Sequence, residues 1–288
     1  MDINDVKLNT IGVVGAGTMG NGIAQVFATS GFAVTLVDIS QQALDRGVVS
    51  IGSSLDRMIK KEIINDDDKS AALSSISCST SIAALASAEF VVEAVTENPE
   101  VKFSIFREVD NVCPENTILA SNTSSISLTR LAAQTSRPEK VIGMHFMNPV
   151  PVMKLVEVIR ALQTADQTCD RTVQLTQALG KTPVLANDSP GFVSNRILIP
   201  MINEAIFALH EGVATPESID EIMKLGMNHP LGPLALADLI GLDVVLSVLR
   251  VLQDGMGDPK FRPCPLLVQM VDAKRLGRKT GVGFYQYD

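Results

Sequence analysis

A glycine-rich turn near the amino terminus constrains the fold of this chain more than any other feature of its sequence. A short apolar strand pattern, Thr10–Val14, runs directly into GxGxxG, and a helical pattern, Gly20–Ser30, follows it. In that setting the first glycine makes the tight turn, the second lets the backbone approach a pyrophosphate, and the third lets the helix pack closely on the strand. The unpaired N–H groups at the start of the helix favour phosphate oxygens. We therefore predict a dinucleotide site; the alternative is a purely structural turn. The predicted contacts are Gly15, Gly17, Thr18, Met19 and Gly20.

An acidic residue after the second strand pattern indicates which dinucleotide binds. Asp38 closes the apolar run Ala33–Val37, at about the spacing of 20 residues that the fingerprint requires. A carboxylate there can accept hydrogen bonds from the ribose hydroxyls of NAD, but it repels the 2′-phosphate of NADP. Two like charges about 4 Å apart, at an effective dielectric constant of about 20, repel by up to about 4 kcal/mol. The next residue is Ile39 rather than an arginine that could receive the phosphate. We predict NAD in preference to NADP.

The alternation of strand and helix patterns indicates βαβ units and a parallel sheet. After Asp188-Ser189-Pro190-Gly191, helical periodicity takes over. A chain of 288 residues is long enough for two domains. We predict an α/β fold with a Rossmann-type doubly wound sheet over residues 1–188, which binds the cofactor. A second, smaller all-helical domain is expected over residues 189–288, for substrate closure and dimerisation.

The individual elements are predicted as follows. The expected strands are Thr10–Val14, Ala33–Val37, Phe90–Ala94, Thr117–Ser121, Val141–Met144 and Leu155–Ile159. The expected helices are Gly20–Ser30, Gln41–Glu62, Val101–Val112, Asp166–Leu179, Ile197–Gly212, Thr215–Gly226, Leu234–Asp254 and Leu266–Leu276. The acidic run Asp66–Asp68 is interpreted as a solvated turn.

Composition argues against several other classes of protein. The net charge of −8, with 24 basic against 32 acidic residues, disfavours a nucleic-acid partner. The four cysteines and three histidines are scattered without metal-ligand spacing, so we predict no metal site and reduced thiols. The amino terminus, Met1-Asp2-Ile3-Asn4-Asp5, is acidic, unlike a signal peptide, and no apolar run is long enough to span a bilayer. We expect a cytoplasmic protein with no membrane partner.

One of the three histidines stands where a proton could be transferred. Hydride transfer from an alcohol needs a base for the hydroxyl proton, and histidine suits this near neutral pH. His210 lies in an amphipathic helical pattern and His229 in a loop, where a solvated or structural role is the simpler interpretation. His145 instead follows the strand pattern Val141–Met144 and opens a polar turn. Ligands of doubly wound folds bind at such strand ends.

A carboxylate interrupts the next apolar strand. Glu157 lies within Leu155–Ile159, where burial of an unpaired charge would be costly. If the intervening turn brings this strand back beside the previous one, Glu157 can reach the ring of His145. It would then fix the tautomer of the ring and stabilise the imidazolium. Spacing alone leaves this pairing open.

Six longer stretches carry a resemblance to a known family. They are Ile11–Gly20, Val92–Asn98, Ser121–Ser125, His145–Pro151 with Lys154–Ile159, Asp188–Arg196 and Lys279–Tyr285. Nearly from end to end, the chain resembles the L-3-hydroxyacyl-CoA dehydrogenases, and most closely the bacterial-type 3-hydroxybutyryl-CoA dehydrogenases. The resemblance implies that His145 is the catalytic base, Glu157 its partner, and Ser124 and Asn195 polar contacts to the reacting substrate. It also implies NAD as cofactor, a homodimer and a place in fatty acid metabolism. From the residues alone, Ser124 and Asn195 have a simpler interpretation as helix caps.

The resemblance assigns further ligand contacts. Positions near the nicotinamide and ribose fall on Glu97, Asn98, Asn122 and Asn148. Contacts to coenzyme A fall on Ser54, Lys61 and Lys102, and Lys102 is also assigned to the cofactor. From the residues alone, the pair Lys60-Lys61 is equally well interpreted as a solvated helix end that complements the helix dipole.

The implied reaction is the reversible oxidation of a (3S)-3-hydroxyacyl-CoA, with a short acyl chain, to the 3-oxoacyl-CoA. One alternative is a related dehydrogenase that acts on a hydroxy acid or sugar acid without coenzyme A, against which the matches at Lys61 and Lys102 argue. A second is a structural, crystallin-like relative, in which a catalytic residue should be lost. A third is a module that only senses NAD and needs no His–Glu pair.

Overall fold

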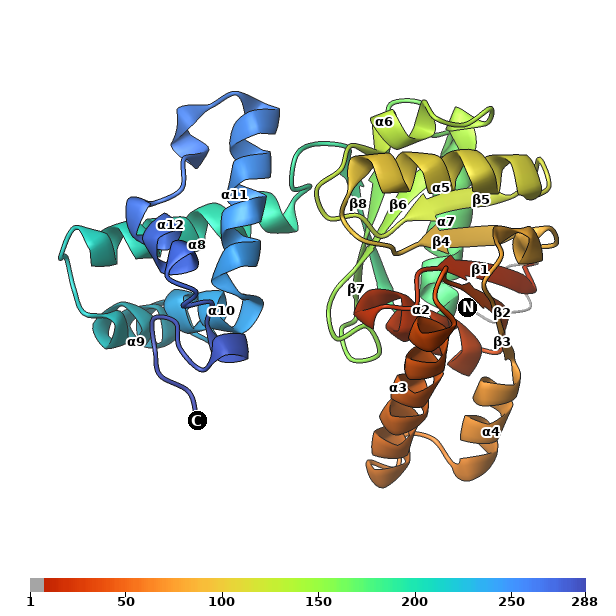
Figure 1. Ribbon diagram of the computed structural model, residues 1–288, viewed down its shortest axis with the longest axis horizontal. Helices are drawn as coiled ribbons and strands as arrows, with labels where there is room; N and C mark the ends of the chain where they lie inside the picture. Colours follow the sequence, from red (N-terminus) through yellow and green to blue (C-terminus); the bar gives the residue numbers. More distant parts are fainter. Residues whose placement is uncertain (1–7) are drawn as a thin grey trace. The chain divides into compact units, whose positions relative to one another are not determined.

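The computed structural model describes residues 8–288, which form two compact units. One unit ends at Asp188 and the other begins at Ser189 (Figure 1). The acidic amino terminus, Met1 to Asp5, lies outside the described residues. No helix in the described part of the chain is long and apolar enough to cross a membrane.

The first unit is built on a sheet of eight strands in the order β3-β2-β1-β4-β5-β6-β7-β8. The strands are β1 (Thr10–Val14), β2 (Ala33–Val37), β3 (Ile76–Ser79), β4 (Phe90–Glu93), β5 (Ile118–Ser121), β6 (Val141–Phe146), β7 (Leu155–Arg160) and β8 (Thr182–Asn187). The pairings from β3 to β6 are parallel, β7 is antiparallel to β6, and β8 is parallel to β7. The chain runs outward from β1 to β3, then returns to β4 on the other side of β1. This reversal confirms the predicted doubly wound sheet and puts its switch point between β1 and β4.

The two strands that the sequence patterns missed both lie at the edges of the sheet. β3, with the sequence ISCS, has no buried residue, and β8, TPVLAN, contains a proline and exposes Val184 and Leu185. An edge strand pairs on one side only, so it needs neither a continuous apolar run nor every backbone N–H. Pattern recognition depends on apolar residues, and these strands have few that are buried.

Among the described residues of this unit, six α-helices flank the sheet: α2 (Thr18–Thr29), α3 (Gln41–Lys60), α4 (Asp66–Ser74), α5 (Pro99–Val112), α6 (Leu128–Ala132) and α7 (Asp166–Ala178). α2 and α7 pack on one face, and α5 packs on the other, against Val91 and Leu119. The interpretation of Asp66–Asp68 as a solvated turn is wrong, because these residues form the first turn of α4. Asn65 and Asp68 make a capping box there, and the acidic side chains complement the positive end of the helix dipole.

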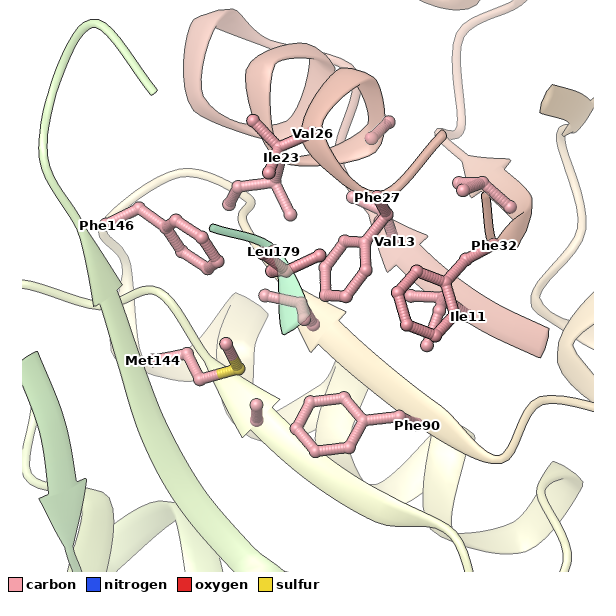
Figure 2. Packing of buried hydrophobic residues seen from close by; sticks show 14 of the residues in the cluster. Ile11, Val13, Ile23, Val26, Phe27, Phe32, Phe90, Met144, Phe146 and Leu179 are labelled. Carbon is pink, nitrogen blue, oxygen red and sulfur yellow. The ribbon is translucent and has the colours of Figure 1, made fainter. Parts of the chain in front are cut away.

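The core beneath α2 fixes this helix on β1. Figure 2 shows Ile23 and Phe27 of α2 packed over the strands that carry Ile11, Val13 and Phe90. The rings of Phe27 and Phe32 meet edge to face, with centroids 5.7 Å apart. Val14 lies on the opposite face of β1 from Ile11 and Val13, and all three are buried, so the strand buries side chains on both faces. The start of α2 is thereby held at the carboxyl end of β1.

The second unit is helical from Ser194 onward. Its helices are α8 (Ser194–His210), α9 (Pro216–Met227), α10 (Pro233–Ile240), α11 (Leu242–Met256) and α12 (Pro265–Asp272). Short 3₁₀ turns occur at Pro259–Phe261 and Arg278–Thr280 here, and at Ile82–Leu85 and Pro138–Lys140 in the first unit. The prediction of one helix over Leu234–Asp254 is wrong: Gly241 has φ of +102° and separates α10 from α11. Glycine adopts this conformation easily, and the apolar periodicity on both sides concealed the break.

Candidate active site

The glycine loop between β1 and α2 has a shape that glycine alone permits. Gly15 has φ of +105°, and a Cβ atom there would lie 2.6 Å from the carbonyl oxygen of Ala94. A Cβ atom at Gly20 would lie 1.7 Å from the carbonyl oxygen of Gly15. By contrast, a Cβ atom at Gly17 would meet no atom within 4 Å, so the second glycine borders open space. This is the arrangement that a phosphate needs in order to approach the backbone.

A cavity of about 330 Å³ opens beside this loop. Its walls come from the ends of β1, β2 and β4 and from the face of α5, so it lies at the switch point of the sheet. The lining residues include Gly15, Gly17, Asp38, Ile39, Val95 and Val101. Gly17 offers the bare backbone that a pyrophosphate requires, and the apolar wall suits a flat aromatic base. The residues present therefore fit a dinucleotide.

Asp38 is tied to the glycine loop. One carboxylate oxygen accepts a hydrogen bond from the backbone N–H of Ala16 at 2.9 Å, and the other accepts one from Ser40 at 3.0 Å. The carboxylate is thus held on the cavity wall by backbone groups. Of the described residues that line the cavity, Asp38 is the only charged one. Its negative charge would face the ribose of a bound nucleotide with no cation on this wall to receive a 2′-phosphate.

A buried ion pair lies at the carboxyl ends of β4 and β5. Glu93, the last residue of β4, is 2% exposed and accepts hydrogen bonds from Lys102 Nζ at 2.6 Å and from Ser121 Oγ at 2.6 Å. Its carboxylate also accepts the backbone N–H of Val95 at 2.7 Å. Lys102, on α5, is 1% exposed and lies 3.3 Å from the carboxylate of Glu97. One ammonium group therefore joins two carboxylates.

Glu97 in turn holds the loop that follows β5. Its Oε1 atom accepts hydrogen bonds from the hydroxyls of Thr123 (2.5 Å) and Ser125 (2.8 Å) and from the backbone N–H groups of Ser124 (2.9 Å) and Ser125 (3.0 Å). Burial alone would raise the pKa of Glu97, but Lys102 and these donors outweigh it, so the pKa lies below its ordinary value. The carboxylate is ionised, and the loop is organised around it.

His145 and Glu157 face one another across the antiparallel pair β6 and β7. They are direct partners in the register, and His145 Nδ1 lies 2.8 Å from Glu157 Oε2. Both residues are buried, with 8% and 4% exposed. The predicted contact is confirmed, although β6 continues to Phe146, so His145 lies within the strand and not after it. Asn122 Oδ1 accepts the backbone N–H of Phe146 at 2.9 Å and ties the end of β5 to β6.

Comparison with known proteins agrees with this geometry. Residues 10–189 match the 3-hydroxyacyl-CoA dehydrogenase, NAD binding domain, and residues 191–287 match the 3-hydroxyacyl-CoA dehydrogenase, C-terminal domain. The chain belongs to the 3-hydroxyacyl-CoA dehydrogenase family. The predicted resemblance and the predicted NAD cofactor are confirmed.

Relatives in the 3-hydroxyacyl-CoA dehydrogenase family extend over the whole chain. A probable 3-hydroxybutyryl-CoA dehydrogenase of Bacillus subtilis (strain 168) is 52% identical, over 98% of this chain and 99% of the relative. A 3-hydroxyadipyl-CoA dehydrogenase of Escherichia coli (strain K12) is 42% identical, over 98% of this chain and 60% of that protein. The crystal structure of an (S)-3-hydroxybutyryl-CoA dehydrogenase from Ralstonia eutropha has a TM-score of 0.96 at 56% identity, with 98% of this chain and 100% of that chain covered.

The ammonium group of Lys102 is surrounded by groups of the protein itself. The side chain is 1% exposed. Glu93, Glu97 and the carbonyl oxygen of Val95, at 3.4 Å, lie around its three N–H donors. The contacts to coenzyme A and to the cofactor that the family resemblance assigned to Lys102 stay predictions.

The other assigned residues are dispersed over several elements. Ser124 is half-buried in the loop after β5, and the cap of α6 is Ser127, so the interpretation of Ser124 as a helix cap is wrong. Asn195 lies in the first turn of α8, in the second unit. The remaining positions are Ser54 within α3, Lys61 exposed at its end, Asn98 at the cap of α5 and Asn148 exposed between β6 and β7. Their ligand contacts stay predictions.

The histidines outside this site agree with their simpler interpretation. His210 is the exposed last residue of α8, and His229 is half-buried just after α9. The residue that sequence reasoning missed is Glu93. It ends an apolar strand as a lone carboxylate, which is the same signal that drew attention to Glu157. Applied to β4, that signal would have indicated a buried partner for Glu93.

Proposed function

We propose that the protein catalyses the reversible, NAD-dependent oxidation of (3S)-3-hydroxyacyl-CoA to 3-oxoacyl-CoA, with 3-hydroxybutyryl-CoA as the representative short-chain substrate. The observation that carries the proposal is the pair of His145 on β6 and Glu157 on β7, 2.8 Å apart, near the carboxyl end of β6 and on the sheet edge that also bears the glycine loop. A base held there is suited to take the proton of a substrate hydroxyl. The names of the Bacillus subtilis and Ralstonia eutropha relatives support the choice of substrate.

NAD, when bound in the cavity, supplies the hydride acceptor. The backbone at Gly15, Gly17 and Gly20 and the first turn of α2, with Thr18 and Met19, would hold its pyrophosphate. Asp38 would accept hydrogen bonds from the adenosine ribose, and the exposed Ile39 offers apolar surface to the adenine ring. At the nicotinamide end, the family resemblance favours Glu97, Asn98, Asn122 and Asn148.

His145 acts as the base in oxidation and as the acid in reduction. Because Nδ1 faces a carboxylate oxygen of Glu157 at 2.8 Å, the ring proton is held on Nδ1. The lone pair of Nε2 is then the one that accepts the hydroxyl proton. Glu157 stabilises the imidazolium that results, without being protonated itself. A positioned general base contributes about 10²- to 10⁴-fold to turnover.

Other residues would bind the acyl-CoA. Ser124 and Asn195 are proposed as polar contacts to the oxygen at the reacting carbon. Ser54 and Lys61 lie about two helical turns apart, so they project from the same side of α3 near its end. The exposed ammonium of Lys61 can move to meet a phosphate of coenzyme A.

We propose a separate role for each unit. The first unit would bind NAD, and the helical unit would close over the substrate and form a homodimer. Support for the dimer comes from exposed apolar side chains on α9 and α10, which are Ile222, Leu225, Met227 and Leu239. If this face is the dimer interface, Leu225→Glu should give monomers in light scattering, whereas Val49→Glu, an exposed position on α3, should not.

A cytoplasmic location completes the proposal. The four cysteines are free thiols: Cys78, Cys113, Cys169 and Cys264. Unpaired thiols fit a reducing compartment. The relative from Bacillus subtilis is bacterial, which fits the same location.

Steady-state kinetics tests the reaction. The purified protein should reduce NAD with (S)-3-hydroxybutyryl-CoA, followed by the absorbance of NADH. His145→Ala should lower turnover by about 10²- to 10⁴-fold and leave the Kd of NAD within about twofold. His210→Ala, at the exposed end of α8, is the matched control and should keep normal turnover. Near-normal turnover of His145→Ala would remove this residue from the mechanism.

A substrate series separates the proposal from its alternative. The CoA ester of 3-hydroxybutyrate should be oxidised with far higher kcat/KM than free 3-hydroxybutyrate. Medium-chain esters and 3-hydroxyadipyl-CoA define the acyl preference, since an adipyl-CoA enzyme is among the relatives. Equal kcat/KM for the ester and the free acid would favour a dehydrogenase of CoA-free hydroxy acids.

A further inference from the structure

Lys102 has a position that the proposed reaction does not explain. It is 1% exposed and lies between Glu93, at 2.6 Å, and Glu97, at 3.3 Å. Taking these charges out of water is costly, and apolar residues of similar volume often stabilise a fold as well as a buried ion pair does. Stability is therefore a weak reason for a lysine at this place. Its neighbours suggest another role, because Glu97 binds the loop that carries Ser124 and Glu93 binds Ser121, the residue of β5 that leads into this loop.

We propose that Lys102 is a positioning residue, which holds Glu97 in place so that Glu97 fixes the loop at Ser124 for substrate binding. The inference rests on the proposed function, because it takes Ser124 to be a substrate contact. Lys102 itself would touch neither the substrate nor the cofactor.

The connection from Lys102 to Ser124 runs through the carboxylate of Glu97. Oε1 of Glu97 accepts the backbone N–H groups of Ser124 and Ser125, at 2.9 and 3.0 Å, and the hydroxyls of Thr123 and Ser125. Oε2 faces the ammonium group of Lys102. Because Glu97 is held at both oxygens, its carboxylate has one orientation, and the backbone at Ser124 follows that orientation.

A second connection reaches the same loop through Glu93. Glu93 accepts the hydroxyl of Ser121 at 2.6 Å, and that hydroxyl oxygen accepts the backbone N–H of Thr123 at 3.1 Å. Lys102 therefore bridges the two carboxylates that hold the start and the middle of the loop. The charged groups near Glu97 in the described structure are Lys102 from α5 and Glu93 from β4. Without the ammonium group, two carboxylates would repel one another across this space.

The decisive variant removes the cation without leaving a buried charge unpaired. Lys102→Met alone would leave Glu93 buried and uncompensated, and it could fail to fold. Glu93→Gln with Lys102→Met removes one charge of each sign, so the net charge of the site is unchanged, and the glutamine can still accept the hydroxyl of Ser121. In this double variant Glu97 has lost its cation. We expect kcat/KM for (S)-3-hydroxybutyryl-CoA to fall by about 10- to 100-fold, as for a misplaced active-site group.

Amide hydrogen exchange measures how firmly the loop at Ser124 is held, and it needs no substrate. The amides of Ser124 and Ser125 should exchange at least about tenfold faster in the double variant, because their common acceptor is no longer fixed. Glu97→Gln should lower kcat/KM similarly, and the triple variant should be little worse than either, since all three residues act through one connection.

A matched control uses the other end of α5. Asp110 forms an ion pair with Arg137 Nε at 2.7 Å, with both side chains 8% exposed. Asp110→Asn with Arg137→Met should lower stability but leave kcat/KM and the exchange of Ser124 unchanged.

The outcomes separate the two proposals. Wild-type exchange at Ser124 in the double variant would overturn the positioning role, even if the enzyme oxidises acyl-CoA as proposed. A rise of about tenfold or more in the Kd of NAD, with exchange unchanged, would also overturn it, by making Lys102 a cofactor contact. Faster exchange would support the positioning role even if Ser124→Ala kept normal kinetics, in which case the substrate contact proposed for Ser124 fails.

Discussion

In the part of the chain that the structure describes, each unit has two carboxylate residues that are less than 5% exposed, and the partners of these carboxylates differ. In the sheet unit, Glu93 and Glu157, 2% and 4% exposed, face the side chains of Lys102 and His145. In the helical unit, Asp220 and Asp238 are 4% and 1% exposed. Asp220 accepts the backbone N–H groups of Leu234 and Ala235, and Asp238 accepts those of Phe284 and Tyr285. Among the described residues, neither aspartate has a Lys, Arg or His partner in an ion pair.

The difference lies in what the partners can do. A backbone N–H group cannot change its charge. The hydroxyls of Tyr285 and Tyr287, which also donate to Asp220 and Asp238, stay neutral near neutral pH because burial raises the pKa of each tyrosine. The two aspartates therefore serve as fixed acceptors that join distant segments. An imidazole gains a charge when it takes a proton, and a carboxylate beside it favours that step. We infer that the glutamates of the sheet unit serve the reaction and that the aspartates of the helical unit serve the fold.

The carboxyl-terminal segment packs so closely on Asp238 that two of its positions must be glycine. A Cβ atom at Gly283 would lie 1.9 Å from Oδ1 of Asp238, and one at Gly277 would lie 2.3 Å from its carbonyl oxygen. The stretch Lys279–Tyr285, which resembles the family, thus wraps around one buried carboxylate. Its likeness to the family has a structural reason in this unit.

The largest effect is expected for a substitution of Glu157, which should lower the turnover number. Glu157→Gln keeps the size of the side chain and a hydrogen bond to the ring, but it removes the charge that stabilises the imidazolium. Turnover of 3-hydroxybutyryl-CoA should drop by about 10²- to 10⁴-fold, with the Kd of NAD unchanged. Steady-state kinetics and NAD titration measure both. Normal turnover of Glu157→Gln would mean that the charge of Glu157 does not serve the reaction.

Asp238→Asn should give the next largest effect, on stability. The amide places a donor among the backbone N–H groups of Phe284 and Tyr285, so at least one hydrogen bond is lost in a buried site. We expect the free energy of unfolding to fall by about 1–3 kcal/mol, with turnover of the folded protein within about twofold. Urea unfolding measures this. Asp243→Asn, which breaks an exposed pair with Lys279 at 2.5 Å, is the control and should cost about 1 kcal/mol or less.

The sequence patterns predict those features of the two units whose residues lie close together in the chain. The glycine loop, the strands around it and the lone carboxylate at Glu157 are visible because their signals lie within about ten residues or in adjacent strands. The link from Glu93 and Glu97 to Ser121 and to the loop after β5 is not visible in this way, because it joins residues 26 to 28 positions apart that the pairing of β4 with β5 brings together. The same holds for Asp238 and Tyr287, which are joined by the path of the carboxyl-terminal segment. Gly241 was overlooked because the apolar periodicity hid a break in the helix.

Asp38 tests whether the partner or the location of a carboxylate decides its role. Its oxygens accept backbone N–H groups, as those of Asp238 do, yet it lies on the wall of the nucleotide cavity. Asp38→Asn removes the charge that would repel a 2′-phosphate. The preference for NAD over NADP in kcat/KM should fall by about tenfold or more. If the wild type already used both cofactors equally well, the predicted role of Asp38 would be wrong.

The smallest effect is expected at Tyr287, whose hydroxyl donates to Asp238 at 3.0 Å. Tyr287→Phe removes one hydrogen bond to a carboxylate that keeps its backbone partners, so the free energy of unfolding should fall by about 1 kcal/mol. The pKa of Tyr287 is raised to about 12, first by burial and then by its hydrogen bond to Asp238 and the charge of Asp238. A raised pKa means that this contribution is complete below the ordinary pKa of about 10 and is lost as the pH rises through about 12. The stability difference between wild type and Tyr287→Phe should therefore shrink between these values. A difference that stays constant across this range would mean that the tyrosine contributes by packing, and that Asp238 holds the carboxyl-terminal segment through backbone N–H groups alone.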